Sequence, residues 1–126
     1  MATLTADQAR YFEAANFGVV GVVTPHCEPR TSIVWVDWDG ENVVFNTTNA
    51  RAKGRHIRGN PKVSVSVWNN DDAYSYIEVV GTATLDEEDA VAHIHKLSHK
   101  YAGKDFDSPV DRVIVRVKPE LVFDHT

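Results

Sequence analysis

The sequence predicts a small antiparallel β-barrel with helices at its periphery. Six short strand-like segments, separated mainly by hairpin-type turns, and three helical segments favour this class. A Gly-x-Gly-x-x-Gly turn, which a doubly wound parallel sheet places after its first strand, is missing from the sequence. A chain of 126 residues can bury one core, so we predict a single domain over residues 1–126.

The chain begins with a helix that two strands follow. Residues 5–15 predict a short helix, because Thr5 can cap its start and apolar residues follow at helical spacing. Residues 18–24 are almost wholly apolar and predict a strand. Residues 30–38 come after a turn and alternate in polarity, which predicts the next strand.

A hairpin and a second helix occupy the middle of the chain. The Asp-Gly pair at 39–40 predicts a tight turn, so that residues 42–47 return antiparallel to the preceding strand. Residues 50–59 predict a short helix with Thr48 or Asn49 as its cap. A Gly-Asn-Pro sequence then ends this helix.

Three strands and one helix complete the fold. Residues 62–68 alternate with a period of two, and residues 74–85 form a longer strand that Gly81 can bend. Residues 87–101 predict a helix with one apolar stripe, and residues 112–117 predict the last strand. Several strands are apolar on both faces, whereas a strand with one face in water alternates. We therefore predict a homodimer in which a second copy covers the outer face.

A cationic segment lies within an acidic chain. The formal net charge is −5, yet residues 42–70 contain no Asp or Glu and five Lys or Arg, which leaves −10 on the remainder. A surface that binds nucleic acid normally needs a cationic excess over its whole extent. We therefore predict no nucleic-acid partner, and instead one small anionic ligand held at the cationic segment.

The sequence also predicts a cytoplasmic protein without a membrane segment or a metal site. No apolar run approaches the roughly 18 residues that a membrane helix needs, and the first residues lack the apolar core of a signal peptide. Cys27 is the single cysteine, which fits a reducing compartment. His95 and His99 share one helix face but lack a third ligand, so we predict no metal.

The start of the predicted helix at residues 50–59 has the composition of an anion site. With Asn49 as the cap, Arg51 and Lys53 fall in the first turn, where free backbone amides already make the potential positive. Cations are unfavourable there, so a bound phosphate is expected to compensate them, with help from the Thr47 and Thr48 hydroxyls. The alternative is an ordinary helix with solvated charges.

Four motifs carry a family resemblance that extends over nearly the whole chain. They are Asn46-Thr47-Thr48, Arg51-Ala52-Lys53, Asn60-Pro61-Lys62-Val63 and Tyr76-Ile77-Glu78-Val79-Val80-Gly81. In this order and spacing they resemble the pyridoxamine 5'-phosphate oxidase-like split β-barrel family, and more narrowly its branch that uses the deazaflavin coenzyme F420. The resemblance implies an FMN-binding type of split barrel that forms homodimers, with a cofactor in each groove between subunits.

The resemblance also implies which residues bind the cofactor. Arg51 and Lys53 would hold the phosphate, and Thr47 and Thr48 would add hydroxyl or amide contacts. Tyr76 would approach the ring from the neighbouring subunit, and Arg55 would suit the polyglutamate tail of F420 together with Arg58 and Lys62. The segment that lines the ring would comprise Pro29, at the turn, and Thr31, Ser32, Ile33 and Val34.

The implied activity is hydride transfer between F420 and a small unsaturated or conjugated substrate. An FMN-dependent oxidoreductase of the same fold is one alternative, because FMN also joins a phosphate to a tricyclic ring. A non-catalytic module that stores flavin, F420 or haem is another. Pyridoxamine phosphate oxidases proper carry a further basic C-terminal segment, so their own activity is not expected. The sequence assigns no proton donor and no substrate.

Overall fold

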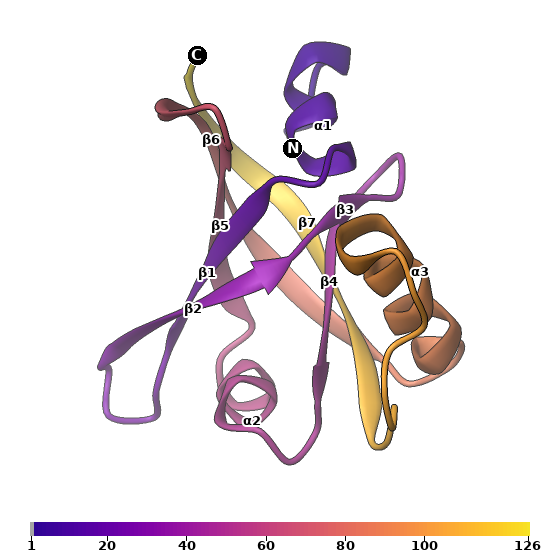
Figure 1. Cartoon of the computed structure of the whole chain (residues 1–126). Helices are drawn as coiled ribbons and strands as arrows, with labels where there is room; N and C mark the ends of the chain where they lie inside the picture. Colours follow the sequence, from indigo (N-terminus) through magenta and orange to yellow (C-terminus); the bar gives the residue numbers. More distant parts are fainter. Residues whose placement is uncertain (1) are drawn as a thin grey trace.

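A computed structural model describes residues 2–126 as one curled antiparallel sheet with three helices around it (Figure 1). The strands are β1 (Phe17–Val23), β2 (Pro29–Trp35), β3 (Asp37–Trp38), β4 (Val43–Thr48), β5 (Lys62–Asn69), β6 (Asp72–Asp86) and β7 (Arg112–His125). The helices are α1 (Ala6–Glu13), α2 (Ala52–Gly59) and α3 (Ala90–Ala102). The predicted β class with peripheral helices is confirmed.

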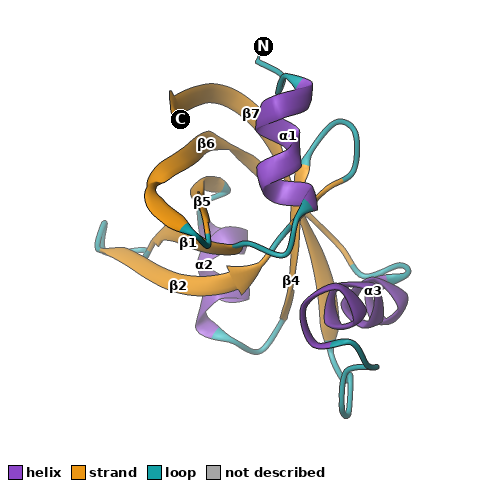
Figure 2. Cartoon of the chain, turned by 45° about the horizontal axis from the view of Figure 1, so that its top comes forward, coloured by secondary structure: helices purple, strands orange, loops and turns teal. Residues whose placement is uncertain are grey.

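The sheet curls into a half-barrel whose strands follow the order β2-β1-β5-β6-β7-β4-β3. Every neighbouring pair in this order is antiparallel. Helices α1 and α2 lie near opposite ends of the barrel, and α3 lies beside β4 (Figures 1 and 2). Helix α3 packs on β4 and β7, and its Lys100 side chain donates to the Phe12 carbonyl of α1 at 2.7 Å.

The core fills the concave side of the sheet, because alternate residues of each strand point inward. In β5 the side chains of Val63, Val65 and Val67 are buried while the residues between them are partly exposed, as the period of two predicts. Phe12 of α1 and Ile57 of α2 join the same core from the two ends. Helix α1 begins with the predicted Thr5 cap, whose hydroxyl accepts the backbone N–H of Gln8 at 3.2 Å.

The sheet has seven strands where the sequence predicts six, because the segment predicted as one strand over residues 30–38 divides at Val36. Val36 is fully buried, and its backbone groups bond to helix α3 instead of a neighbouring strand. Its N–H donates to the Tyr101 hydroxyl at 3.0 Å, and its carbonyl accepts from Lys100 Nζ at 2.5 Å. Side chains from α3 therefore end β2 and begin β3.

Strand β7 continues to His125, well beyond the end predicted at residue 117. Proline has no N–H for a ladder bond, so Pro119 predicts an end to the strand. The structure accommodates Pro119 opposite Gly81, where the register of β6 and β7 shifts. A Cβ at Gly81 would overlap the Lys118 carbonyl oxygen, so the glycine allows the close approach. The predicted irregularity at Gly81 is confirmed.

None of the helices within residues 2–126 is both long enough and apolar enough to span a membrane. Within the same residues, no group of three or more His, Cys, Asp or Glu side chains is arranged to hold a metal ion.

Candidate functional site

A cleft of about 260 Å³ lies where β2, β4, α2, α3 and the start of β7 meet. Its polar wall comprises Asn46, Thr47, Arg51, Lys53 and Arg112. Its apolar wall comprises Ile33, Val34, Trp35, Ile94, Leu97 and Phe106. A cleft with one cationic wall and one apolar wall suits a flat organic ligand that carries an anionic group.

The cationic wall begins where β4 passes into α2. The Thr48 hydroxyl accepts the backbone N–H of Arg51 at 3.1 Å and so fixes the connection. The N-cap residue of α2 is Arg51 itself, which has extended backbone angles and makes no side-chain cap. The predicted cap at Thr48 or Asn49 is therefore wrong, and Lys53, but not Arg51, lies in the first helical turn.

Three cations line the cleft without forming an ion pair with a carboxylate of the described residues. No carboxylate of the described residues lies within salt-bridge distance of Arg51, Lys53 or Arg112. Burial, followed by the charges of Arg51 and Arg112, lowers the pKa of Lys53. Burial, followed by the charge of Arg51, likewise lowers the pKa of Arg112, although the charge of Asp111 opposes this shift. The site is therefore unfavourable for its own cations and would favour an anion.

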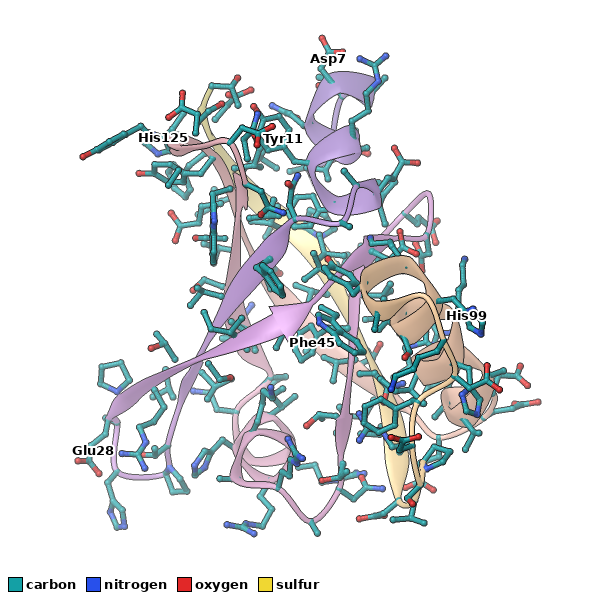
Figure 3. The ribbon with its side chains drawn as sticks, in the orientation of Figure 1. Asp7, Tyr11, Glu28, Phe45, His99 and His125 are labelled. Carbon is teal, nitrogen blue, oxygen red and sulfur yellow. The ribbon has the colours of Figure 1, made fainter. Side chains whose placement is uncertain are left out.

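Phe45 is a core residue that lies beside Lys53. Figure 3 labels its side chain in the space between β2 and β4, and it is fully buried. Lys53 Nζ lies 5.8 Å from the centre of the Phe45 ring, a cation–π distance. This contact holds the Lys53 side chain within the cleft.

The Thr47 hydroxyl is a buried polar atom without a hydrogen-bond partner among the described residues. The residue is only 2% exposed and yet lines the cleft. An unpaired buried hydroxyl costs about 1–3 kcal/mol, so few persist in proteins without a role. A ligand oxygen in the cleft would supply the missing partner.

A hydrogen-bonded chain runs from the cleft into the space beneath α3. Arg112 Nε donates to Asn46 Oδ1 at 2.8 Å. Asn46 Nδ2 in turn lies 3.0 Å from the Ala90 carbonyl and 3.0 Å from His93 Nδ1. Burial lowers the pKa of His93 to about 4, so its imidazole is neutral at neutral pH.

Aromatic side chains form the apolar wall. Trp35 stacks on Tyr101 at 5.4 Å between ring centres and meets the edge of Phe106 at 6.3 Å. The Arg112 guanidinium lies 5.0 Å from the centre of the Phe106 ring. His95 Nδ1 accepts the backbone N–H of Phe106 at 3.1 Å, which fixes the loop that carries this residue.

The structure brings five of the predicted binding residues into this cleft. They are Thr47, Arg51, Lys53, Ile33 and Val34. Thr31 and Ser32 instead line a neighbouring cavity of about 160 Å³, in which Lys53 also takes part. Pro29 is exposed at the start of β2, and the hairpin that precedes it extends away from α3, as the position of Glu28 in Figure 3 shows.

The remaining predicted residues lie outside the cleft of the single chain. Thr48 bonds to the Arg51 backbone, as described above, and Arg55 donates to the Ala50 carbonyl at 2.6 Å. Tyr76 lies on the outer face of β6 and stacks on His125 at 4.3 Å between ring centres. Contact between Tyr76 and a cofactor therefore requires the second subunit that the resemblance implies.

The cationic segment is less isolated in space than in sequence. Arg58 bonds to Asn49 and lies 3.6 Å from Glu87, and Lys62 forms a 3.0 Å ion pair with Glu120. Acids from distant parts of the chain thus compensate two of the cations assigned to a polyglutamate tail. Arg51 and Lys53 are the cations of the segment that line the cleft.

Sequence reasoning missed Arg112, Asn46 and the aromatic wall. Arg112 lies opposite Thr48 in the pairing of β7 with β4, a contact between residues 64 positions apart. No local pattern encodes such a pairing. The available signal was the position of Arg112 at the start of a predicted strand, next to an apolar run, where a cation needs a partner.

A model of the family described as pyridoxamine 5'-phosphate oxidase matches residues 4–126. The chain belongs to this family. This match confirms the resemblance inferred from the four motifs. The search of curated proteins returned no match.

Solved structures agree with this membership. A structure described as an F420 reductase is 31% identical, with a TM-score of 0.85, and the match covers 95% of this chain and 98% of that one. A conserved hypothetical protein of Mycobacterium tuberculosis is 20% identical, with a TM-score of 0.77 and coverage of 98% and 86%. HupZ of Group A Streptococcus is 17% identical, with a TM-score of 0.73 and coverage of 97% and 94%.

These likenesses differ in what they support. The two structures below 25% identity support the fold alone, whereas the F420 reductase is similar in sequence as well. The family and this reductase together support a flavin-type oxidoreductase.

Proposed function

We propose that the protein is an oxidoreductase that binds F420 in the cleft between β2 and α2 and transfers a hydride to or from a small conjugated substrate. The observation that carries the proposal is that Arg51, Lys53 and Arg112 line the same cleft as the unpaired Thr47 hydroxyl, and that no carboxylate of the described residues forms an ion pair with them. The 31% identity with an F420 reductase supports the choice of F420 over FMN.

The residues present fit a phosphate-bearing cofactor. Arg51 and Lys53 would bind the phosphate by charge, and the Thr47 hydroxyl would donate to one of its oxygens. Ile33, Val34 and the aromatic wall would contact the ring and exclude water from one of its faces. The deazaflavin ring, when bound, supplies the hydride chemistry, so the protein's task is to orient the ring and leave one face open to the substrate.

We also propose that the protein is a homodimer. One row of residues crosses the outer face of the sheet from Ile33 through Val19, Ser66 and Glu78 to Phe123. Ile33 is 61% exposed, and Phe123 and the nearby Leu121 are exposed as well. Exposed apolar side chains at both ends of this row form a surface that a second copy would cover.

Titration of the purified protein with F420 and with FMN tests the proposal. Tryptophan and cofactor fluorescence would follow binding, because Trp35 lies in the wall of the cleft. We expect F420 to bind more tightly than FMN. Tight binding of FMN with no response to F420 would select the FMN-dependent alternative, and binding without oxidation of reduced F420 by any enone or quinone would favour the storage module.

The double variant Arg51→Ala with Lys53→Ala locates the phosphate. We expect its affinity for the cofactor to fall about a hundredfold, because two charged hydrogen-bond donors are lost. Arg10→Ala is the control, since Arg10 is an exposed cation of α1 that pairs with Asp7 and does not line the cleft. Equal affinities in the double variant and the control would remove the phosphate assignment.

A further inference from the structure

We propose that Arg112 is a third anion-binding residue of the cleft and that Asn46 is the residue that positions it. The proposal rests on the proposed function, because it assigns a further contact to the same cofactor phosphate. It concerns Arg112, which lies outside the sequence motifs, and Asn46, to which the motifs assign no role.

Arg112 has the position and the environment of a ligand-binding cation. It lies opposite Thr48 on the neighbouring strand, beside the connection that carries Arg51. Its side chain is held on one side by the Asn46 amide oxygen and on another by the face of the Phe106 ring. Arg112 Nε alone is used in the first contact, so the terminal nitrogens stay available to an anion.

A half-buried guanidinium of this kind is costly without an anion. No carboxylate of residues 2–126 lies within 4 Å of it, although Arg116 on the same strand forms a 2.6 Å ion pair with Asp86. The two arginines also differ in the cavity that each lines. Arg112 lines the cofactor cleft, whereas Arg116 lies in a separate, smaller cavity. The missing anion of Arg112 is therefore best supplied by a ligand.

Asn46 fixes the direction of Arg112 because its amide can be oriented in only one way. Its oxygen must face Arg112 Nε, which is a donor, and its nitrogen must face the Ala90 carbonyl, which is an acceptor. The same nitrogen lies 3.0 Å from His93 Nδ1, which then acts as an acceptor. A neutral imidazole with its proton on Nε2 meets this requirement at Nδ1, while Nε2 is buried and has no hydrogen-bond partner among the described residues.

Ligand pairs that differ in the phosphate test the proposal directly. The wild-type protein is titrated with FMN and riboflavin, and with F420 and its deazaflavin chromophore without the phosphate-bearing side chain. The pair that binds is then used with Arg112→Met and Arg112→Lys. We expect Arg112→Met to lower the affinity for the phosphorylated ligand about tenfold and the affinity for the phosphate-free ligand less than about twofold. Arg112→Lys should restore part of the lost affinity.

Asn46→Asp tests the positioning role. Asn46→Asp places a carboxylate on Arg112, so it should remove most of the phosphate-dependent affinity while the guanidinium is still present. Combining Asn46→Asp with Arg112→Met should add little to either loss, since both act on one contact. If Asn46 had only a structural role, Asn46→Asp would lower the affinity for both ligands of the pair equally.

The outcomes separate this proposal from the proposed function. If the wild-type protein binds neither F420 nor FMN, the proposed function fails before any variant is made. If Arg51→Ala with Lys53→Ala loses the phosphate-dependent affinity but Arg112→Met keeps it, the proposed function stands and Arg112 is not a phosphate ligand. Equal losses for both ligands in Arg112→Met would also overturn the proposal, because they would indicate a distorted cleft.

Discussion

At the scale of single residues, two adjacent threonines show how one side-chain type serves two purposes. Thr48 uses its hydroxyl within the chain, where it accepts the Arg51 N–H at the start of α2. The Thr47 hydroxyl is buried and has no partner among the described residues. The first is therefore a structural group, and the second is the group that we propose binds a ligand.

Thr47→Val should separate stability from binding. We expect the free energy of unfolding to stay unchanged or to rise by about 1 kcal/mol, because an unpaired buried hydroxyl is replaced by a methyl group of similar size. Affinity for the cofactor should fall about tenfold, since one hydrogen bond to the phosphate is lost. Chemical denaturation and fluorescence titration measure the two effects.

Thr48→Val is the control for this prediction. It removes the acceptor of the Arg51 N–H, so it should lower the free energy of unfolding by about 1 kcal/mol. A decrease in stability of the same size in Thr47→Val would contradict the assignment, because it would show that the Thr47 hydroxyl already has a partner in the free protein.

The part of the site that could be predicted from the sequence is the part encoded locally. Thr47, Arg51 and Lys53 lie within seven residues, so a strand end and a helix start suffice to bring them together. Arg112 and Asn46 meet through the pairing of two strands that are distant in sequence. Their pairing depends on the whole sheet, and so no local pattern indicates it.

At the scale of elements, the position of α2 depends on close contact with the end of β4. Gly54 lies in the second half of the first turn, where a Cβ would be 2.5 Å from the Thr48 carbonyl oxygen. Only a residue without a side chain allows the helix to start this close to the strand. The contact therefore sets how close the start of α2 lies to the end of β4.

Gly54→Ala should move α2 and weaken the anion site. Alanine favours a helix over glycine by about 1 kcal/mol, but a contact of 2.5 Å with backbone is overpacked, which typically costs about 1–3 kcal/mol. We expect a net loss of stability of about 1–2 kcal/mol by thermal or chemical denaturation, together with weaker cofactor binding.

Gly59→Ala in the same helix is the matched control. A Cβ at Gly59 would meet no atom within 4 Å, so helix propensity should act alone and stability should be unchanged or higher. If Gly54→Ala behaves like Gly59→Ala, the close contact does not determine the position of α2.

The elements also show where a pattern in sequence is overruled by tertiary contacts. The alternation over residues 30–38 is real, since Val34 and Val36 both point into the core. The strand nevertheless divides, because Tyr101 and Lys100 bond to the backbone of Val36. Helix α2 likewise begins at Ala52, two residues later than the sequence predicts. Thr48 and Asp111 accept hydrogen bonds from the backbone amides that the predicted helix cap would bind.

At the scale of the whole molecule, the outer face of the sheet determines the proposed assembly. Leu121 is 54% exposed and lies opposite Val80 on the neighbouring strand. Tyr76 lies on the same face of β6. If a second copy covers this face, Tyr76 becomes available to a cleft that its own chain cannot reach.

Leu121→Asp should convert the proposed dimer into a monomer, because the two copies would bury two unpaired carboxylates in the proposed interface. Sedimentation velocity or light scattering would detect the change in mass. Val110→Asp is the control, since Val110 is exposed in the loop before β7 and away from this face. A wild-type protein that is monomeric at micromolar concentration would contradict the proposal.

The cleft also has a consequence for the closure of the barrel. Strands β2 and β4 contact each other across it, but they are not neighbours in the hydrogen-bonded order of the sheet. A ligand that contacts Ile33 on β2 and Thr47 on β4 would connect these two strands. Occupancy of the cleft would then be coupled to the integrity of the entire barrel, so that the cofactor would act as a folding ligand as well as a reactant.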